Sequence, residues 1–243
     1  MLKVTGHTFS NTLLSMKPII HQYFMLSKLM IFLIGICLPM LLFSILAGHI
    51  WNQGSGLVWD IPVLQVIHTT AQPVLDAIAL TVTPLGVIWG VFPVLFVIGC
   101  VLLSQRSWRS LLYLIITPLG SALLNYLIKL YFHRARPQLW DILTPDTSYA
   151  FPSGHAMSSM TLIVVLAVLA WQTQWRWLVL IGGIFFAFII GWTRLYLGMH
   201  YPSDILAGWM VAIAWSLSMM LIFQPFKSTE KVQAKPFLNT TSF

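Results

Sequence analysis

Long apolar runs separated by short polar stretches dominate this sequence. Six of these runs approach the roughly 20 residues with which an α-helix crosses a bilayer; they cover residues 29–48, 85–103, 111–131, 154–171, 177–194 and 203–223. Prolines fall inside the first three runs, where neighbouring helices of a membrane bundle can satisfy the freed carbonyl groups. The pattern predicts an all-α polytopic membrane protein with six transmembrane helices.

The segment between the first two runs has a different pattern. In residues 57–83, Asp60, His68, Gln72 and Asp76 interrupt the apolar positions. We expect one or two interfacial helices here and no additional span. The chain is then divided into a cytoplasmic leader (1–28), a six-helix membrane domain (29–223) and a cytoplasmic tail (224–243).

Composition supports the membrane assignment and excludes a soluble class. The chain is 58% hydrophobic and 8% charged, whereas soluble domains carry about 25% charged residues. The net charge of +7 does not indicate nucleic acid, because the basic residues lie between apolar runs and form no patch with exposed aromatics. Cys37 and Cys100 both lie within apolar runs, where packing is the expected role.

The basic residues also orient the chain. With a cytoplasmic N-terminus, the inner side holds Lys3, Lys17, Lys28, Arg106, Arg109, Arg176, Lys227, Lys231 and Lys235. The outer side holds Lys129, Arg134, Arg136 and Arg194. This distribution follows the positive-inside rule, and it predicts that the loops after the third and fifth spans face outward.

Three cations in or beside these outer loops are suited to a phosphate group. Lys129 and Arg136 are seven residues apart near the end of the third span, and Arg194 ends the fifth. The guanidinium group offers a planar fork of donors to phosphate, and lysine supplies a point charge. Pro137 disfavours helix at Arg136, so we expect the helix to open into a loop there. Each cation by itself would also fit a headgroup contact at a span end.

The string Pro152-Ser153-Gly154-His155 precedes the fourth span. Free backbone amides and the positive end of the helix dipole meet at such a helix start, which makes it an anion site. Ser153 could cap the helix or donate its hydroxyl to phosphate, and Gly154 permits close approach of the backbone. A plain loop-to-helix turn is the alternative reading of the string alone.

His200 and Asp204 are four residues apart at the start of the last span. One helical turn would let the carboxylate accept from one ring nitrogen and leave the other as a nucleophile. His155 would then protonate the leaving group. Two histidines and one aspartate allow a two-step displacement, and we expect no metal and no cofactor, since the outer loops carry no carboxylate cluster suited to magnesium.

Taken together, the three strings resemble the motifs of the type 2 phosphatidic acid phosphatase superfamily, with Thr193 where the family usually has serine. The resemblance implies His200 as the phosphorylated nucleophile, Asp204 as its partner and His155 as the general acid. It likewise implies phosphate binding by Lys129, Arg136, Ser153, Gly154 and Arg194.

The sequence therefore predicts a membrane phosphatase that acts on a lipid phosphate or pyrophosphate at the outer face of a bacterial inner membrane. Undecaprenyl pyrophosphate is the first choice of substrate. Phosphatidic acid, phosphatidylglycerophosphate and a phosphotransferase reaction stay open, as does a transporter or binding protein for anionic lipids. His133 and Arg134 are weaker candidates for a second phosphate, and Asp141 and Asp146 fit a solvated loop. The sequence does not give the oligomeric state.

Overall fold

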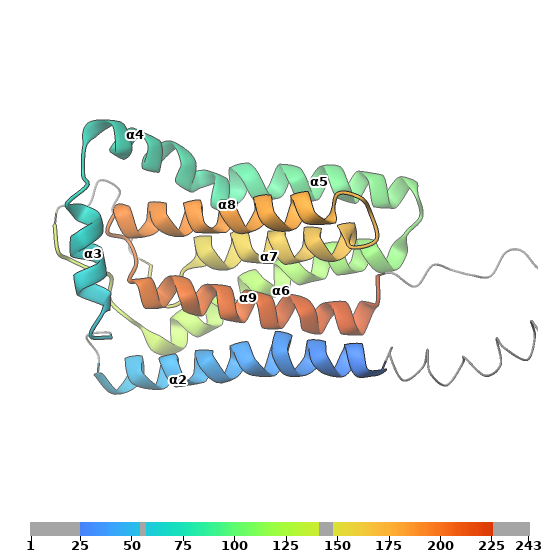
Figure 1. Ribbon diagram of the computed structural model, residues 1–243, viewed down its shortest axis with the longest axis horizontal. Helices are drawn as coiled ribbons and strands as arrows, with labels where there is room; N and C mark the ends of the chain where they lie inside the picture. Colours follow the sequence, from blue (N-terminus) through green and yellow to red (C-terminus); the bar gives the residue numbers. More distant parts are fainter. Residues whose placement is uncertain (1–24, 54–56, 141–147, 226–243) are drawn as a thin grey trace, which may run out of the picture.

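The computed structural model is a bundle of long helices and describes residues 25–53, 57–140 and 148–225 (Figure 1). The helices in chain order are η1 (Ile31–Cys37, a π-helical stretch), α2 (Leu38–Gln53), α3 (Asp60–His68), α4 (Pro73–Val82), η2 (Thr83–Gly86), α5 (Ile88–Ser104), α6 (Trp108–Phe132), α7 (Gly154–Ala170), α8 (Arg176–Tyr196) and α9 (Pro202–Phe223). The proposed leader and tail lie almost entirely outside the described residues.

Among the described residues, five helical segments are long and apolar enough to cross a membrane: Met25–Trp51, Pro73–Ser104, Trp108–Phe132, Arg176–Tyr196 and Pro202–Phe223. This confirms an integral all-α membrane protein. The remaining predicted span, 154–171, corresponds to α7, an apolar helix of 17 residues. Its shortness is compatible with its position, because α7 packs against α6, α8 and α9 inside the bundle.

The region expected to hold interfacial helices needs one correction. Figure 1 shows α3 lying across one end of the bundle, as an interfacial helix would. In contrast, α4 continues through η2 into α5 and forms part of the long apolar segment Pro73–Ser104. The polar Asp76 is accommodated there because the Tyr196 hydroxyl donates to its carboxylate (2.5 Å).

The core is centred on α7 and α9, whereas α2 and α5 present most of their apolar side chains to the outside. Such exposed side chains are expected on helices that face lipid. A glycine on α9 allows the two central helices to approach closely. A Cβ on Gly208 would lie 2.8 Å from the Ser153 carbonyl oxygen and 3.2 Å from the Met157 nitrogen.

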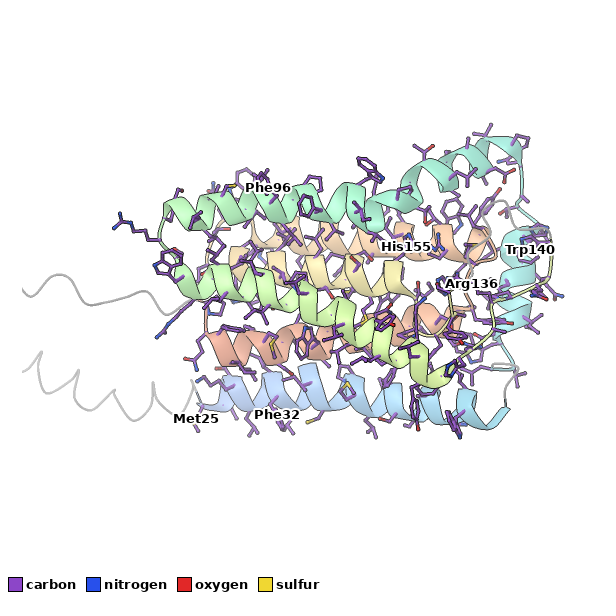
Figure 2. All side chains as sticks on the ribbon, turned by 180° about the vertical axis from the view of Figure 1, so that it is seen from behind. Met25, Phe32, Phe96, Arg136, Trp140 and His155 are labelled. Atoms are coloured by element: carbon purple, nitrogen blue, oxygen red, sulfur yellow. The ribbon has the colours of Figure 1, made fainter. Side chains whose placement is uncertain are left out.

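The ends of the bundle differ in their charges. Arg106 precedes α6, Arg109 lies in its first turn and Arg176 begins α8; these helix ends lie at the end of the bundle opposite α3. Figure 2 shows Arg136, Trp140 and His155 toward the end where α3 lies, and Met25 at the other end. We call the α3 end the site end, because all three motifs converge there.

Candidate active site

A cavity of about 300 Å³ lies toward the site end and joins the three motifs. Its lining includes Lys129, Arg136, His155 and His200, which we call the pocket cluster. The cavity continues between α6 and α7, where its walls include Ser121, Asn125, Ser158 and Thr161. The two histidines, which are 45 residues apart in sequence, therefore face one cavity.

Local backbone structure places the first motif. Helix α6 ends at Phe132 because His133 takes a left-handed conformation (φ 47°), and the chain then leaves the helix toward Arg136. The Arg136 guanidinium donates to the carbonyl oxygens of Ser148 (2.8 Å) and Met199 (2.7 Å). Lys129 Nζ donates to the carbonyl oxygen of Tyr149 (2.5 Å). Both cations also donate to the Ser148 hydroxyl, at 3.2 Å from Lys129 and 2.8 Å from Arg136.

The contacts of His200 fix its tautomer. Arg136 Nη1 lies 3.3 Å from His200 Nε2. A guanidinium group has donors and no acceptor, so Nε2 must accept and carries the lone pair. The proton of the neutral ring is then on Nδ1, which faces Asp204 Oδ2 at 3.4 Å. That separation exceeds an ordinary hydrogen bond, so Nδ1 faces the carboxylate without a short contact in this structure.

The electrostatic surroundings keep the His200 ring neutral. Burial lowers the pKa of His200 well below its ordinary value, and the charges of Arg136, Arg194, Lys129 and His155 lower it further. His200 lies in the connection before α9, two residues ahead of the helix, rather than in a helical turn. The ring of His200 nevertheless faces the carboxylate of Asp204, four residues later in the chain.

The second motif caps the central helix. Ser153 is buried, and its Oγ accepts from the Ala156 amide (3.4 Å) as the N-cap of α7. The structure shows the cap, and donation of the hydroxyl proton to a phosphate stays a prediction. The Ser153 amide donates to the Asp204 carbonyl oxygen (3.0 Å), which joins α7 to α9. Gly154 lies on the cavity wall, where a Cβ would meet Asn125 Oδ1 at 3.1 Å.

The third cation lies behind the cavity wall. Arg194 is 3% exposed, and its Nη1 donates to the Thr83 hydroxyl (3.0 Å). The neighbouring Thr193 hydroxyl also contacts Thr83 Oγ1 (3.2 Å). The charge of Arg194 still acts on His200, whose pKa it lowers.

Arg134 does not act as the sequence suggested. It is 5% exposed and pairs with two carboxylates, those of Asp60 (2.8 Å) and Asp204 (2.5 Å). A guanidinium held in this way is committed inside the protein, which counts against the weaker possibility that Arg134 contacts a second phosphate. We call Asp60, Arg134, Ser203 and Asp204 the buried cluster, since none of the four exceeds 5% exposure.

Sequence reasoning missed several residues that contact the motifs. Asn125 donates to the Pro152 carbonyl oxygen (3.2 Å), and its position one helical turn before Lys129 on an apolar helix was a usable signal. Asp60 and Thr83 carried no such signal, because their partners are distant in sequence. Asp141 and Asp146 lie outside the described residues, and His133 packs edge-on against Tyr149.

Comparisons with known proteins agree with the motifs. A family profile described as the PAP2 superfamily matches residues 108–228. Phosphatidylglycerophosphatase B of Bacillus subtilis is 29% identical over 168 residues, which cover 67% of this chain and 79% of that protein. An undecaprenyl-diphosphatase of the same organism is 28% identical over 114 residues, which cover 45% of this chain and 56% of that protein.

A solved structure gives the same relationship. The crystal structure of a transmembrane PAP2-type phosphatidylglycerolphosphate phosphatase from Bacillus subtilis superposes with a TM-score of 0.70 at 25% sequence identity. The superposition covers 79% of this chain and 96% of the other. The helical bundle and the motif-bearing region are thus both found in known proteins.

Proposed function

Because the chain belongs to the PAP2 superfamily and is a membrane lipid phosphatase of that family, we propose that it cleaves a terminal phosphate from a lipid through a phosphohistidine at His200. The observation that carries the proposal is the pocket cluster. Two cations and two histidines from three separate chain segments line one cavity, and the lone pair of His200 Nε2 lies beside Arg136.

In the first step, His200 Nε2 attacks phosphorus, and the bond between phosphorus and the leaving oxygen breaks. His155 gives its proton to that oxygen, so that a lipid alcohol departs from a phosphomonoester and a lipid phosphate departs from a pyrophosphate. Lys129, Arg136 and Arg194 offset the charge that builds up on the non-bridging oxygens. The Nδ1 proton stays directed at Asp204, whose charge stabilises the ring once Nε2 carries the phosphoryl group.

In the second step, water attacks the phosphohistidine. His155, now deprotonated, takes a proton from the water while the N–P bond breaks and inorganic phosphate leaves. An alcohol could replace water in the same geometry, which would give a phosphotransferase. Ser153 and Gly154 shape the start of α7, whose amides and dipole favour an anion in the cavity.

Phosphatidylglycerophosphate is the first substrate to test. Two similarities support this choice. The alignment with phosphatidylglycerophosphatase B covers 79% of that relative, and the chain superposes on a phosphatidylglycerolphosphate phosphatase. Undecaprenyl pyrophosphate, the first choice from the sequence, is the second candidate because undecaprenyl-diphosphatases also match, over 29% and 56% of their lengths. Released phosphate from a panel of both lipids and phosphatidic acid would rank them.

We further propose that six helices cross the membrane, α7 included, and that the site end faces the periplasm or exterior of a bacterial inner membrane. The arginines at the opposite end support this orientation through the positive-inside rule. Cysteine labelling with a membrane-impermeant reagent tests it. A cysteine at exposed Leu139 should react in intact cells, and one at exposed Trp175 should react only after permeabilisation.

The decisive experiment is His200→Ala in the purified protein. Removing the nucleophile should lower phosphate release by on the order of 10⁴-fold or more, with the thermal unfolding transition retained. His49→Ala is the matched control, because His49 is an exposed histidine on α2 outside the cavity. Full turnover by the His200 variant would remove the enzyme mechanism and favour a transporter or lipid-binding protein.

Two inhibitor tests address the chemistry. Vanadate should inhibit as a phosphate mimic, and activity should survive a chelator. Strict dependence on magnesium would contradict the mechanism, since no metal takes part in either step.

A further inference from the structure

The buried cluster connects the catalytic carboxylate to a helix outside the motifs. Arg134 Nη2 donates to Asp60 Oδ2 (2.8 Å), and Arg134 Nη1 donates to Asp204 Oδ1 (2.5 Å). Asp60 begins α3, outside residues 108–228, which the family profile matches. The Arg134 guanidinium thus connects Asp204, which belongs to the third motif, with Asp60, which belongs to none of the motifs.

Asp60 is fully buried and its carboxylate is saturated with donors. Oδ1 accepts from the Ser203 amide (3.0 Å). Oδ2 accepts from the Ser203 hydroxyl (2.6 Å), the Leu57 amide (3.0 Å) and Arg134. These contacts fasten the start of α3 to the first turn of α9, across 143 residues of sequence.

This arrangement costs desolvation of three charges, and buried ion pairs of this kind contribute little net stability. In some proteins such buried groups serve to specify one geometry, and that is our hypothesis here. The geometry fixed here is that of Asp204. Its Oδ1 is held by Arg134, which leaves Oδ2 to accept from the Tyr201 amide (2.9 Å) and to face His200 Nδ1.

Arg134 is itself held on several sides. It donates to the Ser203 hydroxyl (2.8 Å), and its guanidinium carbon lies 4.2 Å from the centre of the Tyr201 ring. Asp60 is the second carboxylate partner that keeps the guanidinium from moving fully onto Asp204. Without Asp60, Arg134 would neutralise Asp204 and turn the carboxylate away from His200.

We propose that Asp60 is a positioning residue for the chemical step, acting through Arg134 on the orientation and charge of Asp204 toward His200. The inference rests on the proposed function, in which His200 is the nucleophile. It predicts a defect in turnover, because substrate binds to the pocket cluster and Asp60 does not line the cavity.

The test is Asp60→Asn, which preserves side-chain size and removes the charge. We expect kcat to fall about 10–100-fold, as when residues that orient catalytic groups are changed, with KM within about threefold. Asp76→Asn is the matched control. Asp76 is another acidic residue toward the site end, but it pairs with Tyr196 and not with Arg134. Its kcat should stay within about threefold of wild type.

A double-mutant cycle separates positioning from general weakening of the fold. In an Asp204→Asn background, Asp60→Asn should change kcat less than threefold, because the group through which it acts is already altered. Two independent effects would multiply. If Asp60→Asn does not fold, Ser203→Ala removes the hydroxyl between Asp60 and Arg134 and should lower kcat about three- to tenfold with KM unchanged.

Wild-type kcat in Asp60→Asn, a change confined to KM, or multiplicative effects in the cycle would overturn the inference. An unchanged kcat in the Ser203→Ala variant would also overturn the inference. His200→Ala assayed alongside distinguishes the two proposals. If that variant turns over, the proposed function fails; if it is inactive while Asp60→Asn is normal, only the role of Asp60 fails.

Discussion

The pocket cluster and the buried cluster lie beside each other toward the site end, yet their charged groups have different partners. In the pocket cluster, Lys129 and Arg136 donate to backbone carbonyl oxygens and to the Ser148 hydroxyl, which are neutral acceptors. In the buried cluster, Arg134 is paired with two carboxylates. Two arginines separated by one residue therefore lie in different surroundings, Arg136 on the cavity wall and Arg134 among buried carboxylates.

The difference lies in what each arginine is placed to contact. Arg136 lines the cavity beside Lys129 and the two histidines. Arg134 joins two buried carboxylates, and one of these, Asp204, faces the His200 ring through Oδ2. Substitutions should accordingly separate into those that affect catalysis and those that affect folding.

The largest effect on folding is expected from Arg134→Met. This change leaves two buried carboxylates without their guanidinium partner, and breaking a buried pair in this way costs about 3–5 kcal/mol. Unfolding in detergent, followed by heat or denaturant, measures the loss. Arg109→Met is the control, because Arg109 is exposed at the opposite end and surface changes stay within about 0.5 kcal/mol. Equal stability of the two variants would remove the distinction between the clusters.

Arg136→Ala should produce the complementary result. Losing one donor to the transition-state charge lowers kcat/KM by about 10²–10³-fold, while the free energy of unfolding changes far less than in Arg134→Met. Steady-state assays on a lipid phosphate, run beside the unfolding measurement, give both numbers. A variant that is unstable but retains full kcat/KM would reverse our assignment of the two arginines.

The pH profile tests the electrostatics of the pocket cluster. Because the pKa of His200 is lowered by burial first and by the nearby cations second, the ring stays unprotonated below the ordinary histidine value of about 6.5. The acid limb of kcat/KM that belongs to His200 should therefore lie below that pH. Removing Arg136 should raise the pKa of His200 and move the limb upward. A limb at or above pH 6.5 in the wild-type enzyme would contradict this account.

The smallest effect is expected from Ser148→Ala. Lys129 and Arg136 lose one shared hydroxyl acceptor but keep their carbonyl partners, so the change should amount to about 1 kcal/mol or less, roughly fivefold in kcat/KM. Ser104→Ala, at a hydroxyl that bonds only within the exposed end of α5, is the control. A loss as large as that of Arg136→Ala would show that Ser148 takes part in binding phosphate.

Much of the molecule could be predicted from local pattern. The apolar runs correspond to helices because a helix forms its backbone hydrogen bonds within its own segment. The residues of the pocket cluster were found because they lie in short sequence motifs that follow one another in a fixed order. The internal role of Arg134 was not predicted, for a definite reason. The left-handed turn at His133 directs the chain after α6, and a sequence does not reveal which of two nearby arginines then faces the interior.

Asp60 and Thr83 could not be assigned for another reason. Their side-chain partners lie more than 70 residues away, and an isolated polar residue among apolar ones is also typical of a membrane interface. The same ambiguity led to the interfacial assignment of α4. Its polar Asp76 is satisfied by Tyr196, which is 120 residues later.

The contact between α3 and α9 also bears on how the protein is made. Asp60 begins α3, and its hydroxyl and amide partners on Ser203 belong to α9, the last of the helices that the structure describes. Until α9 is synthesised, the carboxylate lacks two of its four donors. We therefore expect a chain that is truncated before α9 to carry an acidic group that it cannot fully accommodate.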